Sequence, residues 1–315
     1  MQHPHSEPSG SWATRCWSSV RRRVVLTASA GLVVAGLAAS VATGAASAYT
    51  VKIDGQTIST NAKLAATVPT SVQSTGMTDI TYNNAPPDEQ VVNGTNVGWE
   101  IDLGRAVAAV LGLKWNLTTS GNFTGFIPGI QSGRYNSSFT SFIQTPARLK
   151  QIDIVTYYNV GTGFAVKKGT ALSIKTPTAL CGHTVAVIAG SAFIQQIQSI
   201  NCKKAGKPAV TVQSFPSDAA AELAVSSGRV EVYSSSEDQL SYLIQKTEHQ
   251  FVLQPLNFLP TPEGAGVAKG LGLTKPIANA MDQLIKSGAY TAIMKKWSIV
   301  NGLVTKATVY SDTKP

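Results

Sequence analysis

The feature that most constrains the fold is an alternation of short strand and helix patterns that starts twice along the chain. Strand-like runs at 77–82 and 114–118 flank a helical spacing of apolar residues at 103–112. A second series of strand and helix patterns starts at 184–188. Strands that alternate with helices predict parallel sheets covered by helices. We therefore expect two α/β units of similar size.

The boundaries of these elements follow from capping residues and breakers. Residues 97–101 are expected to form a short strand, after which Asp102 caps the helix that Gly112 ends. The segment at 49–76 is polar and mixed, and a short helix is expected at 62–69.

The formal net charge of +9 does not indicate a nucleic-acid-binding protein. Charged residues make up only 14% of the 315 residues, and the basic ones are scattered without a long run or interleaved aromatic residues. Hydrophobic residues make up 43%, which is enough for real cores in one or two domains. We expect no nucleic-acid partner.

The first 48 residues have the pattern of an export signal peptide. Arg21, Arg22 and Arg23 precede an apolar run at 24–45, and Ala46-Ser47-Ala48 provides a cleavage site. A membrane anchor is the alternative, because the run is about long enough to span a bilayer. The arginine pair suits the twin-arginine route as well as the general one. We expect an exported protein that is soluble in the periplasm or the extracellular space.

The three cysteines suit one disulfide in an oxidising compartment. Cys16 precedes the apolar run, so it is badly placed for a lipid anchor and no lipobox is found. Removal of the signal leaves Cys181 and Cys202, which flank the first strand-helix unit of the second series. A helix that returns towards the start of its strand makes a bridge feasible, worth about 3 kcal/mol for this loop length. Free buried thiols are the alternative.

The stretch 123–148 predicts a pocket for a small carboxylate. Thr145-Pro146 is a strong helix start, and Arg148 lies in the first turn. A guanidinium matches a carboxylate with two parallel hydrogen bonds. A surface arginine is the alternative, although a cation is mildly unfavourable at this end of a helix.

Hydroxyl residues provide further candidate contacts to the carboxylate. Thr140 and Ser141 end the strand at 137–142, and their hydroxyl and amide groups can complete the cradle. Ser191 follows Gly190 at a helix start, where free N–H groups attract anions. Ordinary strand-end residues and a plain N-cap are the alternatives.

Four motifs in this order resemble the extracellular solute-binding proteins of polar amino-acid ABC transporters, family 3. They are residues 98–103, 123–148, 228–231 and 288–297, and the resemblance covers about 77–299. It implies a two-lobe periplasmic-binding-protein-like fold of type II. Each lobe has a mixed sheet flanked by helices, and a two-segment hinge near Val166 and Val267 joins them.

The resemblance also implies how the chain divides between the lobes. The first lobe is expected to be discontinuous, at 77–164 plus 267–305, with the second lobe at 165–266. Residues 49–76 form an N-terminal lead segment, and 306–315 form a C-terminal tail.

By the same resemblance, Arg148 binds the ligand's carboxylate, and Phe123 and Tyr82 are candidate aromatic walls, with core packing as the alternative.

The chain departs from the family pattern at several positions. Ile143 stands where a third hydroxyl is common, Tyr82 stands where an acidic residue is common, and the usual loop aromatic falls at Ala85. The aspartate that binds the ligand's ammonium falls at Ser236, so Glu237 is the next candidate.

A solute-binding protein is therefore the expected function, rather than an enzyme. Only His183 and His249 are present beyond the signal, and the sequence has no catalytic, phosphate-binding or metal-binding motif. No cofactor and no metal are expected. The expected partners of this monomer are an amino acid or related carboxylate and a membrane permease. A periplasmic dehydratase of the cyclohexadienyl type and a ligand-sensing input domain are the alternatives on the same fold.

Overall fold

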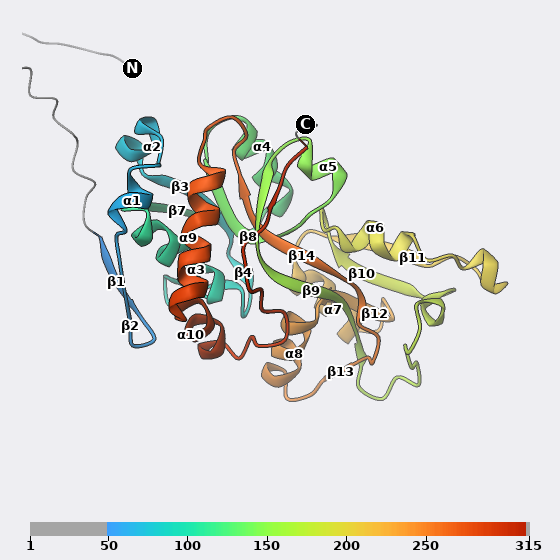
Figure 1. Ribbon diagram of the computed structural model, residues 1–315. Helices are drawn as coiled ribbons and strands as arrows, with labels where there is room; N and C mark the ends of the chain where they lie inside the picture. Colours follow the sequence, from blue (N-terminus) through green and yellow to red (C-terminus); the bar gives the residue numbers. More distant parts are fainter. Residues whose placement is uncertain (1–48, 313–315) are drawn as a thin grey trace, which may run out of the picture. The chain divides into compact units, whose positions relative to one another are not determined.

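The computed structural model describes residues 49–312 and shows a two-lobe α/β fold. Two long strands, β9 (Asp153–Lys167) and β14 (Phe258–Val267), run antiparallel beside each other between the lobes (Figure 1). The strand order is β11-β10-β12-β9-β14-β8-β3-β7, with β13 and β15 also paired to β9. The expected mixed sheets flanked by helices are confirmed.

The first lobe has a parallel core of three strands. β3 (Met77–Tyr82) lies between β7 (Trp115–Ser120) and β8 (Ser137–Ile143) and pairs in parallel with both. The buried side chains Trp99, Phe139, Met281 and Tyr290 belong to its core. The helices of this lobe are α3 (Trp99–Val110), α4 (Phe126–Gln131), α5 (Pro146–Leu149), α9 (Thr274–Ser287) and α10 (Ala289–Lys296), with a 3-10 turn at Phe123–Gly125.

The second lobe repeats the arrangement with fewer residues. β10 (Thr184–Ile188) pairs in parallel with β11 (Thr211–Phe215) and with β12 (Val232–Ser236), which lies antiparallel to β9. The other elements are α6 (Phe193–Gln198), α7 (Asp218–Ser226), α8 (Glu237–Lys246), β13 (Phe251–Leu253) and 3-10 turns at Pro177–Leu180 and Lys203–Ala205. The order of strands and helices is the one that the sequence predicts.

The expected strand at 97–101 is wrong, because α3 starts at Trp99. A small antiparallel sheet of β4 (Asn84–Ala85), β5 (Glu89–Val92) and β6 (Thr95–Val97) precedes it. Gly98 is the N-cap, with a φ of 147° that only glycine adopts readily. Asp102 does not cap the helix; its carboxylate accepts hydrogen bonds from Lys296 Nζ at 2.7 Å and Trp297 Nε1 at 2.9 Å. This early start places Glu100 in the first helical turn, where it is fully buried.

The lead segment contains a hairpin that was not expected from the sequence. β1 (Thr50–Ile53) and β2 (Gln56–Ser59) pair across Asp54-Gly55, and both turn residues have positive φ. An Asp-Gly pair between two strand-like runs is a strong hairpin signal. The helical part divides into α1 (Ala62–Ala65) and α2 (Thr70–Thr75), and the whole segment packs on the first lobe's core.

A short strand near residue 310 pairs with one of the central strands. β15 (Val309–Tyr310) lies within the segment expected to be a tail and pairs with Val155 and Ile154 of β9. Ala307, just before β15, belongs to the large buried cluster that includes residues of α3, α9 and α10.

Among residues 49–312, no helix is long and apolar enough to cross a membrane. The export signal expected at 1–48 lies outside the described residues.

The expected disulfide between Cys181 and Cys202 is present, with a Cα–Cα distance of 5.6 Å. It joins the turn before β10 to the turn after α6 and closes a loop of 21 residues. Replacing both cysteines by alanine should lower the free energy of unfolding by about 3 kcal/mol, since the unfolded chain regains the entropy of the open loop. Urea unfolding of the oxidised protein and the double variant measures this difference. Equal midpoints would contradict it, and the reduced wild type, which keeps both cysteine side chains without the bridge, controls for the loss of side-chain packing.

Candidate functional site

A cavity of about 70 Å³ lies between the lobes and receives side chains from both. From the first lobe come residues of β3, β8, the β4–β5 loop and the α5 turn, and from the second lobe come residues at the starts of α6, α7 and α8. The cavity brings together seven of the residues expected from the sequence: Tyr82, Phe123, Thr140, Ser141, Arg148, Ser191 and Ser236.

Arg148 lies at the start of α5 and contacts both lobes. Thr145 is the N-cap, and its hydroxyl accepts a hydrogen bond from the Arg148 amide at 3.3 Å. The guanidinium donates from Nη1 to the Ile143 carbonyl at 2.8 Å and from Nη2 to the Gly190 carbonyl of the second lobe at 3.0 Å. A guanidinium has five N–H donors, so these two bonds leave donors for a ligand.

Two aromatic rings hold the guanidinium in place. Its central carbon lies 5.6 Å from the ring centre of Phe123 and 5.2 Å from that of Phe142. The two rings are stacked with centres 5.4 Å apart. Burial lowers the pKa of Arg148 to about 10, and the nearby Glu263 carboxyl opposes this effect. The arginine therefore remains charged at neutral pH, in a position fixed by stacking and hydrogen bonds.

The donors of Thr140 and Ser141 are engaged by carboxyl groups of the protein itself. Glu100 Oε1 accepts from the Ser141 amide at 2.7 Å and from the Ser141 hydroxyl at 2.8 Å. Glu89 accepts from the Thr140 hydroxyl, and Glu100 also accepts from the Tyr157 hydroxyl. Glu89 and Glu100 thus accept from the Thr140 and Ser141 groups that were expected to bind a ligand's carboxylate.

Ser141 adopts a left-handed backbone conformation with a φ of 46°. This conformation costs a residue other than glycine about 1–2 kcal/mol. The two hydrogen bonds to Glu100 and a third from the Ser141 hydroxyl to Glu263 at 3.2 Å offset that cost. Strained residues of this kind are concentrated at binding sites.

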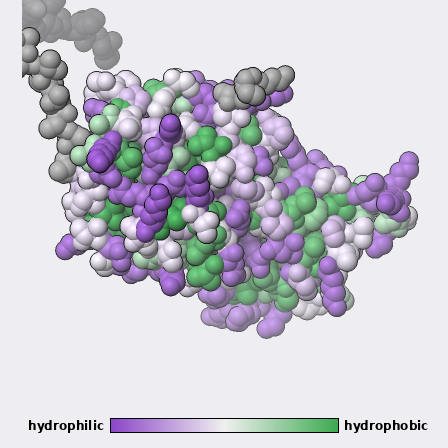
Figure 2. All heavy atoms as spheres, in the orientation of Figure 1, coloured by the Kyte–Doolittle hydropathy of each residue, from purple (hydrophilic) through white to green (hydrophobic). Residues whose placement is uncertain are grey.

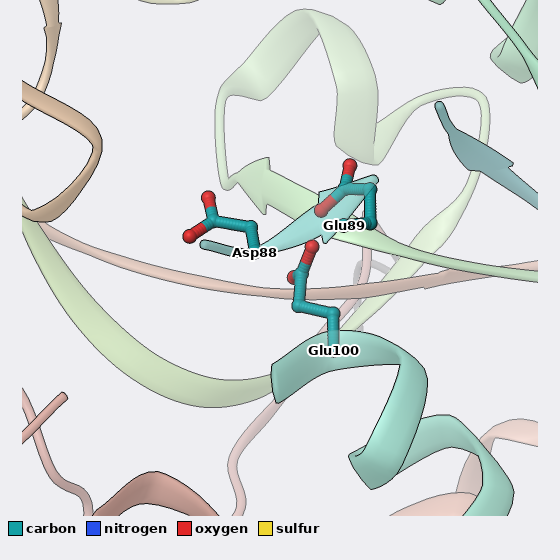
Figure 3. Close-up of side chains that lie close together, drawn as sticks. All are labelled: Asp88, Glu89 and Glu100. Carbon is teal, nitrogen blue, oxygen red and sulfur yellow. The ribbon is translucent and has the colours of Figure 1, made fainter. Parts of the chain in front are cut away.

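Asp88, Glu89 and Glu100 form a buried carboxyl cluster in which one oxygen of each lies within 4.8 Å of the others. Figure 3 shows the Glu89 and Glu100 side chains turned toward each other, while the Asp88 carboxyl points away from them. Trp99 Nε1 donates to Asp88 at 2.7 Å. Because each residue already accepts a hydrogen bond from the protein, we interpret the cluster as a hydrogen-bonded network and assign no metal ion to it.

Burial makes these carboxyl groups hard to ionise together. It raises the pKa of Glu89, Glu100 and Glu263, and repulsion from neighbouring carboxylates raises that of Glu89 and Glu263 further. The hydrogen bond between Glu89 and Glu100 favours the proton on Glu89. In the described part of the chain, Arg148 is the only basic residue that lines this cavity, against the acidic residues Asp88, Glu89, Asp218 and Glu263.

The second lobe contributes shorter polar side chains. The Ser191 hydroxyl accepts from the Phe193 amide at 3.1 Å, and the Ser236 hydroxyl accepts from the Gln239 amide at 3.4 Å as the N-cap of α8. Asp218 accepts from the Tyr233 hydroxyl at 2.7 Å, and burial raises its pKa to about 6. This lobe therefore adds an acidic group to the cavity.

Glu237 does not line this cavity. Its carboxylate accepts a hydrogen bond from Asn257 Nδ2 at 2.6 Å and lines a different cavity of about 560 Å³, between α8, β9 and residues 296–302. The neighbouring Asp238 lines that cavity too, and Gln239 returns to the first one. One turn of α8 therefore faces two cavities.

The sequence reading missed the acidic lining of the site. The burial of Glu100 at a helix start was not expected, because a strand is predicted at 97–101. Asp88 and Glu89 follow two prolines in a stretch that reads only as a turn. Glu263 lies between Pro262 and Gly264, which do not indicate a strand, whereas the structure places it in β14 with 2% exposure. The spacing Gly98 to Glu100 was the one available signal, since glycine before an apolar helical pattern can mark a helix start.

Comparisons with known proteins agree with this architecture. Residues 78–300 match the model of the bacterial extracellular solute-binding proteins, family 3. The arginine-binding protein ArgT of Corynebacterium glutamicum is 26% identical over 221 residues, which cover 69% of this chain and 72% of that protein. The probable amino-acid-binding protein YxeM of Bacillus subtilis is 25% identical over 211 residues, covering 65% and 77%.

A solved structure of an ancestral arginine-binding protein bound to arginine superposes with a TM-score of 0.64 and 31% identity, covering 70% of this chain and 97% of that one. The ancestral amino-acid-binding protein AncCDT-1, a precursor of cyclohexadienyl dehydratase, superposes with a TM-score of 0.62 and 27% identity, covering 72% and 97%. Residues 78–300, which match the family model, include every residue that lines the cavity between the lobes. The chain belongs to the bacterial extracellular solute-binding proteins, family 3.

Proposed function

We propose that this protein binds a cationic amino acid between its two lobes. The observation that carries the proposal is the charge pattern of the cavity, where Arg148 is the basic side chain in a lining that is otherwise neutral or acidic. An amino acid with a positively charged side chain has one carboxylate and two cationic groups. Its charges therefore complement the cavity better than those of a neutral or acidic amino acid.

Arg148 is the proposed anchor of the ligand's carboxylate. Its free donors adjoin the cavity, and cation–π contacts with Phe123 and Phe142 help to hold the guanidinium there. Thr140 and Ser141 act differently from the expectation, because their donors hold Glu89 and Glu100. We assign them to positioning these carboxyl groups, while Phe123 and Tyr82 form the walls.

The cationic groups of the ligand are assigned to the acidic lining. Ser236 cannot bind an ammonium group as an aspartate would, and Glu237 faces another cavity. Asp88, Glu89, Asp218 and Glu263 line the site instead. The arginine-binding proteins among the relatives support this ligand class.

We place the hinge within the crossing of β9 and β14. β9 pairs with β14 up to Thr162 and with β12 from Thr162 to Val166. Val166 and Val267, where the hinge was expected, each lie inside the sheet of one lobe. The proposed boundaries are therefore close to Thr162 and to the stretch 258–263. Ligand binding favours closure by its differential affinity for the closed form.

We also propose that residues 1–48 direct export of the protein. The exported protein would then deliver its ligand to an ABC transporter permease. The face drawn in Figure 2 mixes hydrophilic and hydrophobic side chains, as transient protein contacts do. No residues are assigned to the permease contact.

A dehydratase is the second candidate, because the dehydratase precursor is among the similar structures and the cavity contains carboxyl groups with raised pKa values. Protonated carboxyl groups can serve as general acids. We favour binding without turnover, since the relatives named above are amino-acid-binding proteins.

A thermal-shift screen of the twenty amino acids, opines and cyclohexadienyl carboxylates tests the proposal. A ligand at 100 times its Kd should stabilise the folded protein by about 2.7 kcal/mol, which raises Tm by roughly 5–10 °C for a protein of this size. We expect arginine and lysine to give the largest shifts. Larger shifts with glutamate, or conversion of a cyclohexadienyl carboxylate followed by chromatography, would overturn the proposed class.

A further inference from the structure

A second cavity adjoins the ligand cavity. It has a volume of about 270 Å³ and lies between β4 of the first lobe and the helices α7 and α8 of the second. Three residues line both cavities, namely Ala85, Asp218 and Gln239. Ala85 and Asp218 are 6% and 7% exposed, so the junction of the two cavities is buried where the lobes meet.

The ligand cavity alone is small for the proposed ligand. Its volume of about 70 Å³ corresponds to roughly five water molecules. Arginine and lysine each have more non-hydrogen atoms than that, and cavities for small ligands usually measure about 300–1,000 Å³. Only together with the neighbouring 270 Å³ does the space approach this range. A long side chain therefore needs the second cavity.

Two carboxyl groups of one helix face line the second cavity. Asp218 and Glu222 are one helical turn apart on α7. The Asp218 carboxylate accepts a hydrogen bond from the Tyr233 hydroxyl at 2.7 Å. The Glu222 carboxylate has neither a hydrogen bond nor an ion pair with any residue of 49–312. Like charges at this spacing destabilise a helix, so a positive group beside both carboxylates is favourable.

No basic side chain of the protein neutralises these two carboxyl groups. In the described part of the chain, Lys246 is the one basic residue that lines the second cavity. It is the exposed last residue of α8, and its ammonium lies 5.4 Å from the centre of the Tyr242 ring without an ion pair to Asp218 or Glu222. Burial and repulsion from Asp218 raise the pKa of Glu222 to about 7. The acidic side of the cavity thus lacks a cation.

The ligand cavity gives an independent sign that a polar ligand binds at the junction. Tyr82 lines this cavity together with Ala85 and Asp218. The Tyr82 side chain is 3% exposed, yet its hydroxyl has no hydrogen-bond partner among the described residues. A buried polar group of this kind is costly unless a ligand or water satisfies it.

We propose that the second cavity is the subsite for the ligand's side chain: the side chain passes Ala85, and its terminal cation binds to the carboxylates of Asp218 and Glu222. The inference rests on the proposed function and deepens it, because it assigns a place to one end of the amino acid. Arg148 holds the carboxylate at the other end, in the first cavity. Ala85 has only a methyl side chain, which leaves the passage open. The protein therefore selects its ligand by length as well as by charge.

L-lysine and L-2-aminoheptanoate test the charge of the subsite. Their side chains have the same length, but the second ends in a methyl group instead of an ammonium group. Isothermal titration of the full chain at pH 8, above the pKa of Glu222, gives the Kd of L-lysine, and displacement of L-lysine gives that of the neutral analogue. We expect Glu222→Gln and Asp218→Asn each to reduce the preference for L-lysine about 10- to 100-fold.

The preference separates a role in binding from general damage to the fold, because damage weakens both ligands alike. An unchanged preference in either variant would overturn the assignment of that carboxylate. Glu248→Gln removes an exposed carboxyl group between α8 and β13 and should keep the wild-type preference. Lys246→Gln removes a like charge, so it should leave L-lysine binding equal or stronger. Weaker binding of L-lysine by Lys246→Gln would indicate the reverse orientation of the ligand and would overturn the proposal.

Ala85→Leu tests the passage between the cavities. The larger side chain partly fills the junction, so it should weaken binding of L-lysine and of L-2-aminoheptanoate about tenfold. L-alanine has no side chain that reaches the second cavity, and its affinity should stay within about twofold. Equal losses for the short and the long ligands would overturn the passage at Ala85. The half-buried Glu222→Gln keeps the proposal testable if Ala85→Leu does not fold.

The same titrations distinguish failure of the subsite from failure of the proposed function. Binding of L-lysine or L-arginine by the wild type, with an unchanged preference in Glu222→Gln and Asp218→Asn, would overturn the subsite and leave the proposed function standing. Failure of both cationic amino acids to bind the wild type would overturn the proposed function and the subsite together. A reduced preference in the two variants, with a wild-type preference in Glu248→Gln, supports both.

Discussion

Replacing Arg148 by methionine should weaken amino-acid binding by about 2–5 kcal/mol, which is roughly 30- to 5,000-fold in Kd. Methionine keeps much of the contact with Phe123 and Phe142 but removes every donor for the ligand's carboxylate. Arg148→Lys keeps the charge and loses the planar fork, so we expect a smaller loss of about 10- to 100-fold. Isothermal titration with the best ligand of the thermal-shift screen measures both effects.

The fold of these variants needs its own control. Arg148 also donates to the carbonyls of Ile143 and Gly190, so methionine leaves two carbonyls without this partner and should lower Tm. Arg134→Met removes an exposed arginine that stacks on Tyr135 outside the cavity, and it should leave affinity unchanged. Equal affinity of Arg148→Met and Arg134→Met at a temperature where both are folded would rule out the assigned anchor.

Replacing Gly98 by alanine should lower the free energy of unfolding by about 3–5 kcal/mol, the sum of a backbone cost and a steric cost. Gly98 has a φ of 147°, and a Cβ there would lie 1.9 Å from the Asp88 carbonyl oxygen. To relieve this overlap, either the start of α3 or the loop that carries Asp88 and Glu89 must move. We therefore expect weaker ligand binding together with the lower stability, measured by urea unfolding and by titration.

Gly94→Ala separates the two costs. Gly94 lies in the turn between β5 and β6 with a φ of 75°, but a Cβ there meets nothing within 4 Å. Only the backbone cost applies, so its loss of stability should be about 1 kcal/mol. Similar stabilities of the two variants would show that the chain relaxes around Gly98 at little cost.

The architecture was predictable because it depends on patterns that repeat along the chain. The strand at 184–188 is expected and observed over the same residues, and Thr145-Pro146 marks the start of α5 correctly. Hydrophobic periodicity and caps are local properties, so a single sequence reveals them. The Cys181–Cys202 bridge was predictable for a related reason, since it closes one strand-helix unit.

The electrostatics of the site were not predictable in the same way. Glu100 and Glu263 are 163 positions apart in the sequence, yet both hydrogen-bond the Ser141 hydroxyl. A sequence shows that a carboxyl group exists but not that it is buried beside others, and burial is what raises these pKa values. For this reason the role that we propose for Ser141, a support for acidic side chains, differs from the ligand contact expected from the sequence.

Gly190 has a consequence for how closely the two lobes can approach. A Cβ at this position would lie 3.0 Å from Thr124 Cγ2 on the opposite lobe, close to the Phe123 ring. A side chain here would crowd Thr124, which would have to shift by a few tenths of an ångström. The lack of a side chain at residue 190 therefore permits a close approach of the two lobes beside Ser191 and Phe123, which line the cavity.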